Sequence, residues 1–270
     1  MNSPQHPEGI ALQVREALAE DVGDGDLTAR LVDANQVFTA TLISREPAIV
    51  CGGPWITAVF KQLDPGIEIE FLLQDSEPIT AMQTWCTVKG PARALLTGER
   101  TALNFAQALS GTATATRAMI DQIAGTRAQL LDTRKTLPGM RAAQKYAVRC
   151  GGGVNHRMGL YDGILVKENH IRAAGSIANA IDLALKNPKG VALVEIEVEN
   201  LSEFSQALDA GAKRILLDNF SNTDLEKAVA LNNGQVELEA SGNVNLQTIR
   251  AIAGTGVNFI SCGQITKDIK

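Results

Sequence analysis

The fold is decided by residues 192–263, which read ALVEIEVENLSEFSQALDAGAKRILLDNFSNTDLEKAVALNNGQVELEASGNVNLQTIRAIAGTGVNFISCG. Four short apolar runs in this stretch are predicted strands, Ala192–Val198, Arg214–Asp218, Val236–Ala240 and Asn258–Cys262. They end near residues 197, 218, 241 and 263, at even intervals of 21, 23 and 22 residues. Because helix-like stretches separate them, the pattern predicts a parallel sheet, and the even spacing favours a barrel or an incomplete barrel.

The same alternation extends toward the N-terminus. Gln129–Asp132 and Gly163–Val166 are two further predicted strands. The predicted helices between the strands are Met140–Val148, Ile177–Leu185, Glu203–Ala210, Asp224–Leu231 and Leu246–Ala253. No Gly-x-Gly-x-x-Gly motif follows a predicted strand, which argues against an open dinucleotide-binding sheet.

The first part of the chain has a different pattern. A four-residue apolar spacing from Ile10 predicts a helix, and a long small-residue-rich helix is expected from about Glu99. Between them, short β-like runs surround one helical stretch. The strands are predicted at Phe38–Ile43, Ile67–Leu73 and Trp85–Lys89, and the helix at Trp55–Leu63. Strands with few helices are typical of a small α+β domain.

Composition excludes several classes of function. The chain has 270 residues and a formal net charge of −5, so neither nucleic acid nor an anionic membrane is the expected partner. The four cysteines form no Cys-x-x-Cys pair, and Met1–Gly9 lacks an apolar signal core. The acidic turn Asp24–Asp26 lacks the ligand set of a calcium loop. We therefore expect a soluble, cytoplasmic protein.

Polar residues follow nearly every predicted strand of the second part. The strand ends carry Asp132–Lys135, Lys167–His170, Asp218–Asn219, Ser241–Asn243 and Gly263–Gln264. Glu195, Glu197 and Glu199 alternate along one strand, and we expect at most two of them to do chemistry. Because catalytic groups of α/β barrels lie at the carboxyl ends of the strands, these residues are candidates for one site.

Positive charge is concentrated in one segment. Residues 134–172 hold eight basic and two acidic residues, a net +6, whereas the remainder of the chain is −11 (17 basic, 28 acidic). A solvated helix face explains Arg141, Lys145 and Arg149, but not the cations at strand ends and loops. Since guanidinium groups grip carboxylates and phosphates at two points, this segment predicts a substrate with several negative charges.

Glycines mark two kinds of loop. Gly151–Gly153 precede His156 and Arg157, and are either a flexible linker or a loop that approaches a ligand. Gly242 and Gly263 each follow one of the last two strands, the usual phosphate position in an α/β barrel. Carboxylates close to such a phosphate would suit sugar hydroxyls or a divalent metal.

Several strings together resemble the quinolinate phosphoribosyltransferases, also called carboxylating nicotinate-nucleotide pyrophosphorylases. They are GERTALN (98–104), DTRKT (132–136), NHR (155–157), LVKENH (165–170), VEIEV (194–198) and LLDN (216–219), with EDVG (20–23) and GDLT (25–28) near the start. The resemblance implies an α/β fold of two domains. Residues 1–112 would form an α/β sandwich onto which C-terminal residues can pack back, and residues 113–270 an incomplete, TIM-like α/β barrel.

The resemblance also implies an activity. Quinolinate and phosphoribosyl pyrophosphate would give nicotinate mononucleotide, pyrophosphate and carbon dioxide in de novo NAD biosynthesis, with Mg²⁺ required. The enzyme would be a head-to-tail homodimer in which Arg100 completes the neighbouring site. Arg134, His156, Arg157 and the partner's Arg100 would hold the two carboxylates of quinolinate.

The remaining roles are implied in the same way. Lys135 and Lys167 would lie between the acid and the phosphoribosyl group, and Glu197 and Asp218 would bind ribose hydroxyls or Mg²⁺, directly or through water. The other implied substrate-binding residues, most of them at the 5′-phosphate, are Thr133, Ser241, Gly242, Asn243, Cys262, Gly263 and Gln264. Gly242-Asn243 and Gly263-Gln264-Ile265 depart from the commoner family pattern.

Two other functions stay open. One is a relative of the same fold, a nicotinate phosphoribosyltransferase or a homologue associated with molybdenum uptake. The complete set of Arg100, Arg134, His156 and Arg157 favours a dicarboxylate substrate over these. The other is a non-catalytic anion-binding protein, against which the intact Lys135, Lys167, Glu197 and Asp218 argue.

Overall fold

A computed structural model describes residues 4–186, 191 and 193–268. The described chain divides into two compact units. Unit 1 holds residues 4–117 and 138–152, and unit 2 holds residues 118–137 and 153–268 with the gaps just given. We expected the boundary after residue 112, with C-terminal residues able to pack back on the first domain, whereas the chain leaves unit 1 after residue 117, returns to it for residues 138–152, and leaves it again. Residues 264–268 belong to unit 2, and residues 269–270 lie outside the described part.

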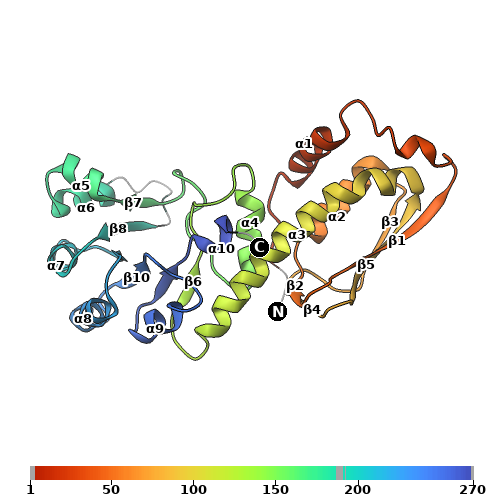
Figure 1. Ribbon diagram of the computed structural model, residues 1–270. Helices are drawn as coiled ribbons and strands as arrows, with labels where there is room; N and C mark the ends of the chain where they lie inside the picture. The colour runs from red at the N-terminus through yellow and green to blue at the C-terminus, as the bar shows by residue number, and fades with distance from the viewer. Residues whose placement is uncertain (1–3, 187–190, 192, 269–270) are drawn as a thin grey trace. The chain divides into compact units, whose positions relative to one another are not determined.

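Unit 1 is built on an antiparallel sheet with helices beside it (Figure 1). The sheet has the order β1-β5-β3, and in its register Val37 lies opposite Pro91. Its strands are β1 (Val37–Ile43), β3 (Glu68–Phe71) and β5 (Thr84–Pro91), with a separate pair of β2 (Ala48–Ile49) and β4 (Pro78–Ile79). The helices are α1 (Ile10–Val22), a 3₁₀ turn at Ala29–Leu31, α2 (Gly53–Leu63), α3 (Ala92–Gln122) and α4 (Arg141–Cys150).

Helix α3 begins at Ala92 rather than near Glu99. Ala92 and Leu95 are buried in its first turns, so the helix starts as soon as Pro91 ends the preceding strand. Its residues up to Arg117 belong to unit 1 and the rest to unit 2. The expected boundary at residue 112 and the observed one after Arg117 both fall inside this continuous helix.

Helix α4 differs from our expectation. The sequence placed it among the helices of the barrel, but its buried Tyr146 and Ala147 join the apolar core of unit 1 together with Trp55. The Tyr146 hydroxyl donates a 2.8 Å hydrogen bond to Asp75, whose carboxylate also accepts the backbone N–H groups of Gly52 and Gly53. An apolar stripe predicts that a helix has a buried face, but not which core receives it.

Unit 2 is a curved parallel sheet of six strands, which confirms the predicted barrel-like class. The strands are β6 (Gln129–Leu131), β7 (Ile164–Val166), β8 (Val194–Val198), β9 (Arg214–Asp218), β10 (Glu237–Ser241) and β11 (Phe259–Ser261). Their order is β6-β11-β10-β9-β8-β7, so the two edge strands are consecutive in the chain and no ladder joins them within the described residues. The barrel is thus incomplete.

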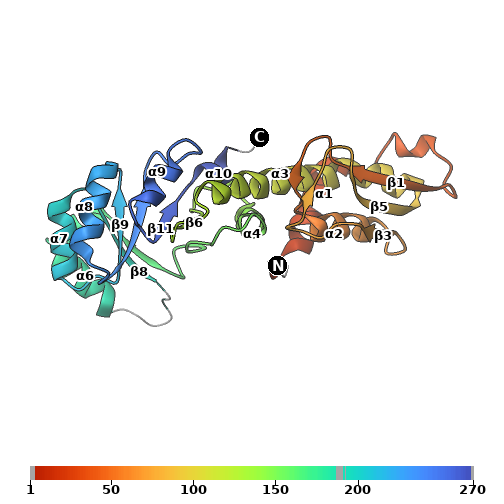
Figure 2. The ribbon, with the colours of Figure 1, turned by 90° about the horizontal axis from the view of Figure 1, so that it is seen from below.

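Helices follow the strands of unit 2 along the outer side of the sheet (Figures 1 and 2). They are α5 (Glu168–Ala174), α6 (Ile177–Lys186), α7 (Leu201–Asp209), α8 (Asn222–Asn232), α9 (Ile249–Gly254) and α10 (Gln264–Lys267). The sequence did not predict α5 or α10. In the described part of the chain, no helix combines the length and apolar character needed to cross a membrane.

The segment that follows α4 pairs with β6 at the open side of the barrel. Val154 pairs with Leu131 through a single parallel bridge, and its N–H donates to Leu130 O at 2.9 Å. Asp132 N–H donates back to Val154 O at 3.2 Å. Consequently residues 155–157 are held beside the end of β6 instead of in a free loop.

Candidate functional site

Polar side chains alternate along the inner strands of unit 2. In β8 and β10 these are Glu195, Glu197, Glu239 and Ser241, and Ser241 is in register with Asp218 of β9. Glu195 and Glu239 are buried, whereas Glu197 and Ser241, closer to the carboxyl ends, are partly exposed. A row of polar groups therefore leads from the interior of the barrel to its carboxyl edge. Glu199 lies beyond β8 and is exposed.

A cavity of about 320 Å³ opens at the carboxyl ends of β6, β10 and β11. Eight of the predicted substrate residues line it, namely Thr133, Lys135, Ser241, Gly242, Asn243, Cys262, Gly263 and Gln264. It also contains Val244, Asn245, Ser261, Lys267 and Asp268, which the sequence analysis did not select. Lys267 could have been noticed as a cation shortly after the last strand.

The backbone around this cavity explains two residues that depart from the family pattern. Asn243 has φ +52°, a left-handed conformation that Asn adopts more readily than most residues with a Cβ. Gln264 is a helical residue, and its position does not require glycine. At the preceding Gly263, by contrast, an added Cβ would lie 2.9 Å from Lys135 Cδ. Thr266 Oγ1 donates a 2.7 Å hydrogen bond to Lys135 O. The loops after β6 and β11 are therefore packed tightly on each other.

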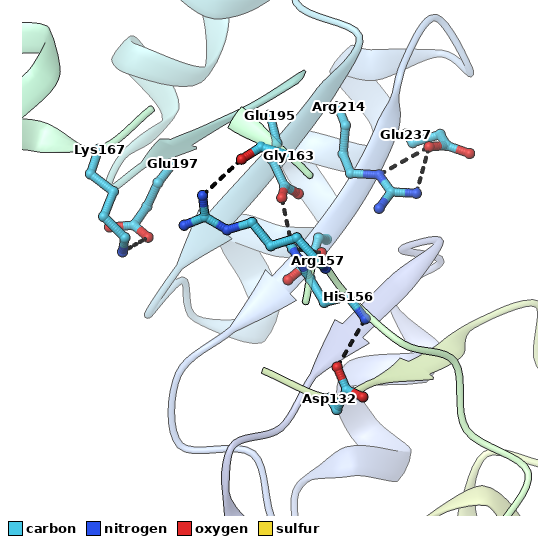
Figure 3. A network of polar contacts seen from close by, with 10 residues as sticks. Asp132, His156, Arg157, Gly163, Lys167, Glu195, Glu197, Arg214 and Glu237 are labelled. Atoms are coloured by element: carbon cyan, nitrogen blue, oxygen red, sulfur yellow. Dashed lines mark hydrogen bonds and ion pairs between the residues drawn. The ribbon is translucent and has the colours of Figure 1, made fainter. Parts of the chain in front are cut away.

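Ionic groups meet at the ends of β7, β8 and β9. Lys167 Nζ and Glu197 Oε2 form a 2.5 Å ion pair between β7 and β8 (Figure 3). Asp218 at the end of β9 accepts a 2.7 Å hydrogen bond from the Asn219 side chain. Lys167, Glu197 and Asp218 thus stand at the ends of three neighbouring strands, and Lys135 lies in the cavity wall.

The segment Asn155–Arg157 is fixed by Asp132, which directly follows β6, and by Glu195 of β8. The buried Asp132 carboxylate accepts the backbone N–H of His156 at 2.9 Å and the side-chain amide of Asn155. His156 Nε2 lies 2.9 Å from Glu195 Oε2, and Arg157 donates to Gly163 O at 3.0 Å (Figure 3). Sequence reasoning selected Asp132 at a strand end but not its contact with this segment, and it missed Glu239, which belongs to none of the motifs.

Burial dominates the electrostatics of this region. It raises the pKa of Glu195 to about 7 and, together with the neighbouring Glu195 charge, the pKa of Glu239 to about 8. It also lowers the pKa of Arg157, as does the nearby Arg134 guanidinium. Two cationic side chains that repel each other in a half-buried position favour the binding of an anion between them.

Gly151 shows that the glycine run is not only a flexible linker. A Cβ at Gly151 would lie within 2.5 Å of Thr116 Cβ, so the end of α4 packs directly against α3. Gly152 has φ +96° and is the last residue of this segment that belongs to unit 1. The loop is therefore shaped by close packing and by one left-handed residue.

Arg100 belongs to the other unit. It is an exposed residue of α3 and lines a cavity of about 890 Å³ in unit 1, which also includes Phe38, Ile43 and Leu96. These three apolar side chains are themselves exposed, at 37%, 41% and 43%. Unit 1 thus presents a hollow that combines apolar surface with a cation.

Comparison with known proteins gives one family. A model described as quinolinate phosphoribosyl transferase, C-terminal domain, matches residues 112–270, and the corresponding N-terminal domain model matches residues 26–110. A probable carboxylating nicotinate-nucleotide pyrophosphorylase of Synechocystis sp. is 40% identical over 251 residues, which cover 92% of this chain and 85% of that protein. A decarboxylating quinolinate phosphoribosyltransferase of Nicotiana tabacum is 38% identical, with 99% and 82% covered.

A solved structure agrees with these relatives. The nicotinate-nucleotide pyrophosphorylase of Francisella tularensis superposes with a TM-score of 0.95 at 49% identity, covering 100% of this chain and 96% of that one. Human nicotinic acid phosphoribosyltransferase shares the fold at 14% identity, with a TM-score of 0.61 over 93% of this chain and 72% of the human one.

Proposed function

The chain belongs to the quinolinate phosphoribosyltransferase family, and from this premise we propose how its own residues perform the reaction. The enzyme is a phosphoribosyltransferase that converts quinolinate and phosphoribosyl pyrophosphate to nicotinate mononucleotide, pyrophosphate and carbon dioxide, in NAD biosynthesis. The observation that carries the residue assignment is the cavity at the barrel's carboxyl edge, which is lined by Lys135, Lys267 and the turns at Gly242 and Gly263.

The dicarboxylate binds to two arginines that are not among the residues lining this cavity. Arg134 and Arg157 are close enough for their charges to repel, and a quinolinate carboxylate between them replaces that repulsion by attraction. His156 precedes Arg157 and fixes its backbone, since Arg157 N–H donates to His156 Nδ1 at 2.7 Å. A monocarboxylate such as nicotinate would leave part of this positive charge uncompensated.

The glycine-rich side binds the phosphoribosyl group. Ser241, Gly242 and Asn243 surround the cavity together with residues 262–264, and their backbone N–H groups are suited to the 5′-phosphate. Thr133 and Lys135 close the cavity from the β6 side. Asp218 and Glu197 at the adjoining strand ends would accept hydrogen bonds from the ribose hydroxyls.

Electrostatic stabilisation of the leaving group and of the carbanion accounts for the steps of the reaction. The pyridine nitrogen attacks C1 of the ribose while the C1–O bond to pyrophosphate breaks, and Lys135 and Lys167 neutralise charge on the leaving group. Holding both substrates fixes nitrogen and C1 at reacting distance. The alkylated nitrogen is cationic, so the electron pair left at C2 by departing carbon dioxide is stabilised until it takes up a proton.

Magnesium fits the carboxylates at the strand ends. Glu197 and Asp218 offer oxygen ligands, the type that Mg²⁺ prefers, and the ion pair with Lys167 makes contact through water more favourable for Glu197 than direct coordination. Bound there, Mg²⁺ would supply charge neutralisation for the pyrophosphate.

The assay that tests this function uses the purified chain with Mg²⁺, phosphoribosyl pyrophosphate, and either quinolinate or nicotinate. We expect quinolinate to yield equal amounts of nicotinate mononucleotide and carbon dioxide, and nicotinate to yield neither. Turnover of nicotinate would favour the monocarboxylate relative. Absence of turnover with both acids would favour a non-catalytic anion-binding protein.

We also place the enzyme in the cytoplasm and propose that it is a homodimer in which Arg100 reaches the neighbouring site. Four buried free cysteines support the reducing compartment. The exposed hollow around Arg100 supports the dimer, because isolated apolar surface of this kind is usually covered by a partner.

Mixing two inactive variants tests the shared site. Arg100→Ala and Arg157→Ala should each be inactive, but a heterodimer has one site with both arginines intact. Random reassortment at equal concentrations should therefore restore about one quarter of wild-type activity. If Arg100 served the site of its own chain, the mixed sample would stay inactive after subunit exchange, which light scattering and differently tagged subunits can verify.

A further inference from the structure

Two carboxylates, Glu195 and Glu239, lie buried side by side next to His156, which directly precedes Arg157. Arg134 and Arg157 together are called the quinolinate clamp below. The Glu195 and Glu239 side chains are 0% exposed, and their Oε2 atoms lie 2.9 Å and 3.6 Å from His156 Nε2. Apart from each other and Ser261, the two carboxylates have no further hydrogen-bond partner for Glu195 Oε1 or for either oxygen of Glu239 among the described residues. Burying polar groups in this way is costly, and apolar residues would fill the same space at lower cost.

The His156 ring links these carboxylates to the backbone of Arg157 through its two nitrogen atoms. Nδ1 accepts the Arg157 backbone N–H at 2.7 Å, so the ring hydrogen resides on Nε2 and is directed at Glu195. From the opposite side, Asp132 holds the His156 backbone N–H at 2.9 Å. The turn that bears Arg157 is therefore clamped from β6 and from β8 (Figure 3).

The other charged groups around Glu195 and Glu239 have different main partners or lie farther away than His156. Arg214 of β9 acts on both carboxylates electrostatically, but its guanidinium forms its ion pair with Glu237, at 2.7 Å, and stacks over Phe259 at 3.9 Å. Arg157 and Glu197 are the other charged groups that face Glu195, and Ser261 faces Glu239. His156 is thus the group to which both carboxylates present an oxygen within ion-pair distance.

We propose that Glu195 and Glu239 are positioning residues for the quinolinate clamp, which hold His156 at Nε2 and through its Nδ1 set the backbone of Arg157. This inference rests on the proposed function, because it assumes that Arg157 grips a substrate carboxylate. Such a grip requires the guanidinium to be held within a fraction of an ångström, and the chain just before this turn contains glycines.

Steady-state kinetics of Glu195→Leu and Glu195→Gln test the proposal, with Glu237→Gln of β10 as the matched control. Glu195→Leu removes the acceptor and should raise the KM for quinolinate about 10- to 100-fold, with the KM for phosphoribosyl pyrophosphate changed less than about twofold. Glu195→Gln keeps an acceptor oxygen and should stay within about threefold of wild type, as should Glu237→Gln. Glu239→Gln should have an effect between those of Glu195→Gln and Glu195→Leu.

Other outcomes would overturn the proposal. One is an unchanged KM for quinolinate in Glu195→Leu. The other is an equal rise of the KM values for both substrates with no rescue by Glu195→Gln, because a residue with a merely structural role would give that result. Imidazole ¹⁵N spectra provide a readout independent of turnover, because the chain has three histidines. Wild type and Glu195→Gln should show His156 protonated at Nε2 in a hydrogen bond that Glu195→Leu lacks. If Glu195→Leu does not fold, a wild-type spectrum that lacks this hydrogen bond is by itself enough to overturn the proposed positioning role. If the wild type shows the bond but no turnover, the proposed function fails instead.

Discussion

Replacing Arg157 by alanine is expected to lower kcat/KM for quinolinate roughly 10²- to 10³-fold, because a two-point, charge-assisted grip on a carboxylate is lost. The folded protein should tolerate the change. Burial and the Arg134 charge already lower the pKa of Arg157, so removing it relieves repulsion at the cost of one hydrogen bond to Gly163 O. Isothermal titration with quinolinate and steady-state rates give the two measurements.

Arg172→Ala is the matched control, since Arg172 lies in the same basic segment but is 74% exposed and pairs with Glu168 on α5. It should leave both measurements unchanged. Arg134→Ala should resemble Arg157→Ala. Wild-type affinity for quinolinate in either clamp variant, with an unchanged melting temperature, would contradict the clamp.

The sequence predicted those parts of the fold that depend on local pattern. The strand Arg214–Asp218 was placed at its observed bounds, and the other inner strands within two residues, because apolar runs between turn residues mark buried strands. Eight of the thirteen residues that line the cavity at the barrel edge were named from the sequence, most of them through the family resemblance, and Gly242 and Gly263 mark its turns. Helix α5 was missed because it follows Lys167 directly, without the loop that usually separates a strand from its helix.

What the sequence left undetermined depends on packing between distant elements. Nothing local in Arg141–Cys150 tells whether it covers the barrel or, as observed, joins the core around Trp55. Glu195 was seen as one of three alternating acids, but its contact with His156 arises because β8 and the returning loop meet at the open side of the barrel. Such contacts join residues 39 positions apart and require the tertiary fold.

The second large effect is expected from Gly242→Ala, which should raise the KM for phosphoribosyl pyrophosphate at least about tenfold and destabilise the protein by about 2–4 kcal/mol. Gly242 has φ +98°, a conformation that strains any residue with a Cβ. The new methyl group would also overlap the Asn219 side-chain oxygen and come within 3.0 Å of Asn219 Cα. Because Asn219 follows Asp218 and bonds its carboxylate, the ribose site should move with it.

Gly254→Ala separates this effect from a general intolerance of alanine, because Gly254 lies at the end of α9 with no atom within 4 Å of the added Cβ. That variant should keep wild-type kinetics and be as stable as wild type or slightly more so. Thermal unfolding and the KM for each substrate distinguish the two variants. Since Arg134 and Arg157 lie outside the altered turn, the affinity of Gly242→Ala for quinolinate should change much less than its KM for phosphoribosyl pyrophosphate. Equal loss of both would mean that Gly242 supports the barrel edge as a whole and not the phosphate turn in particular.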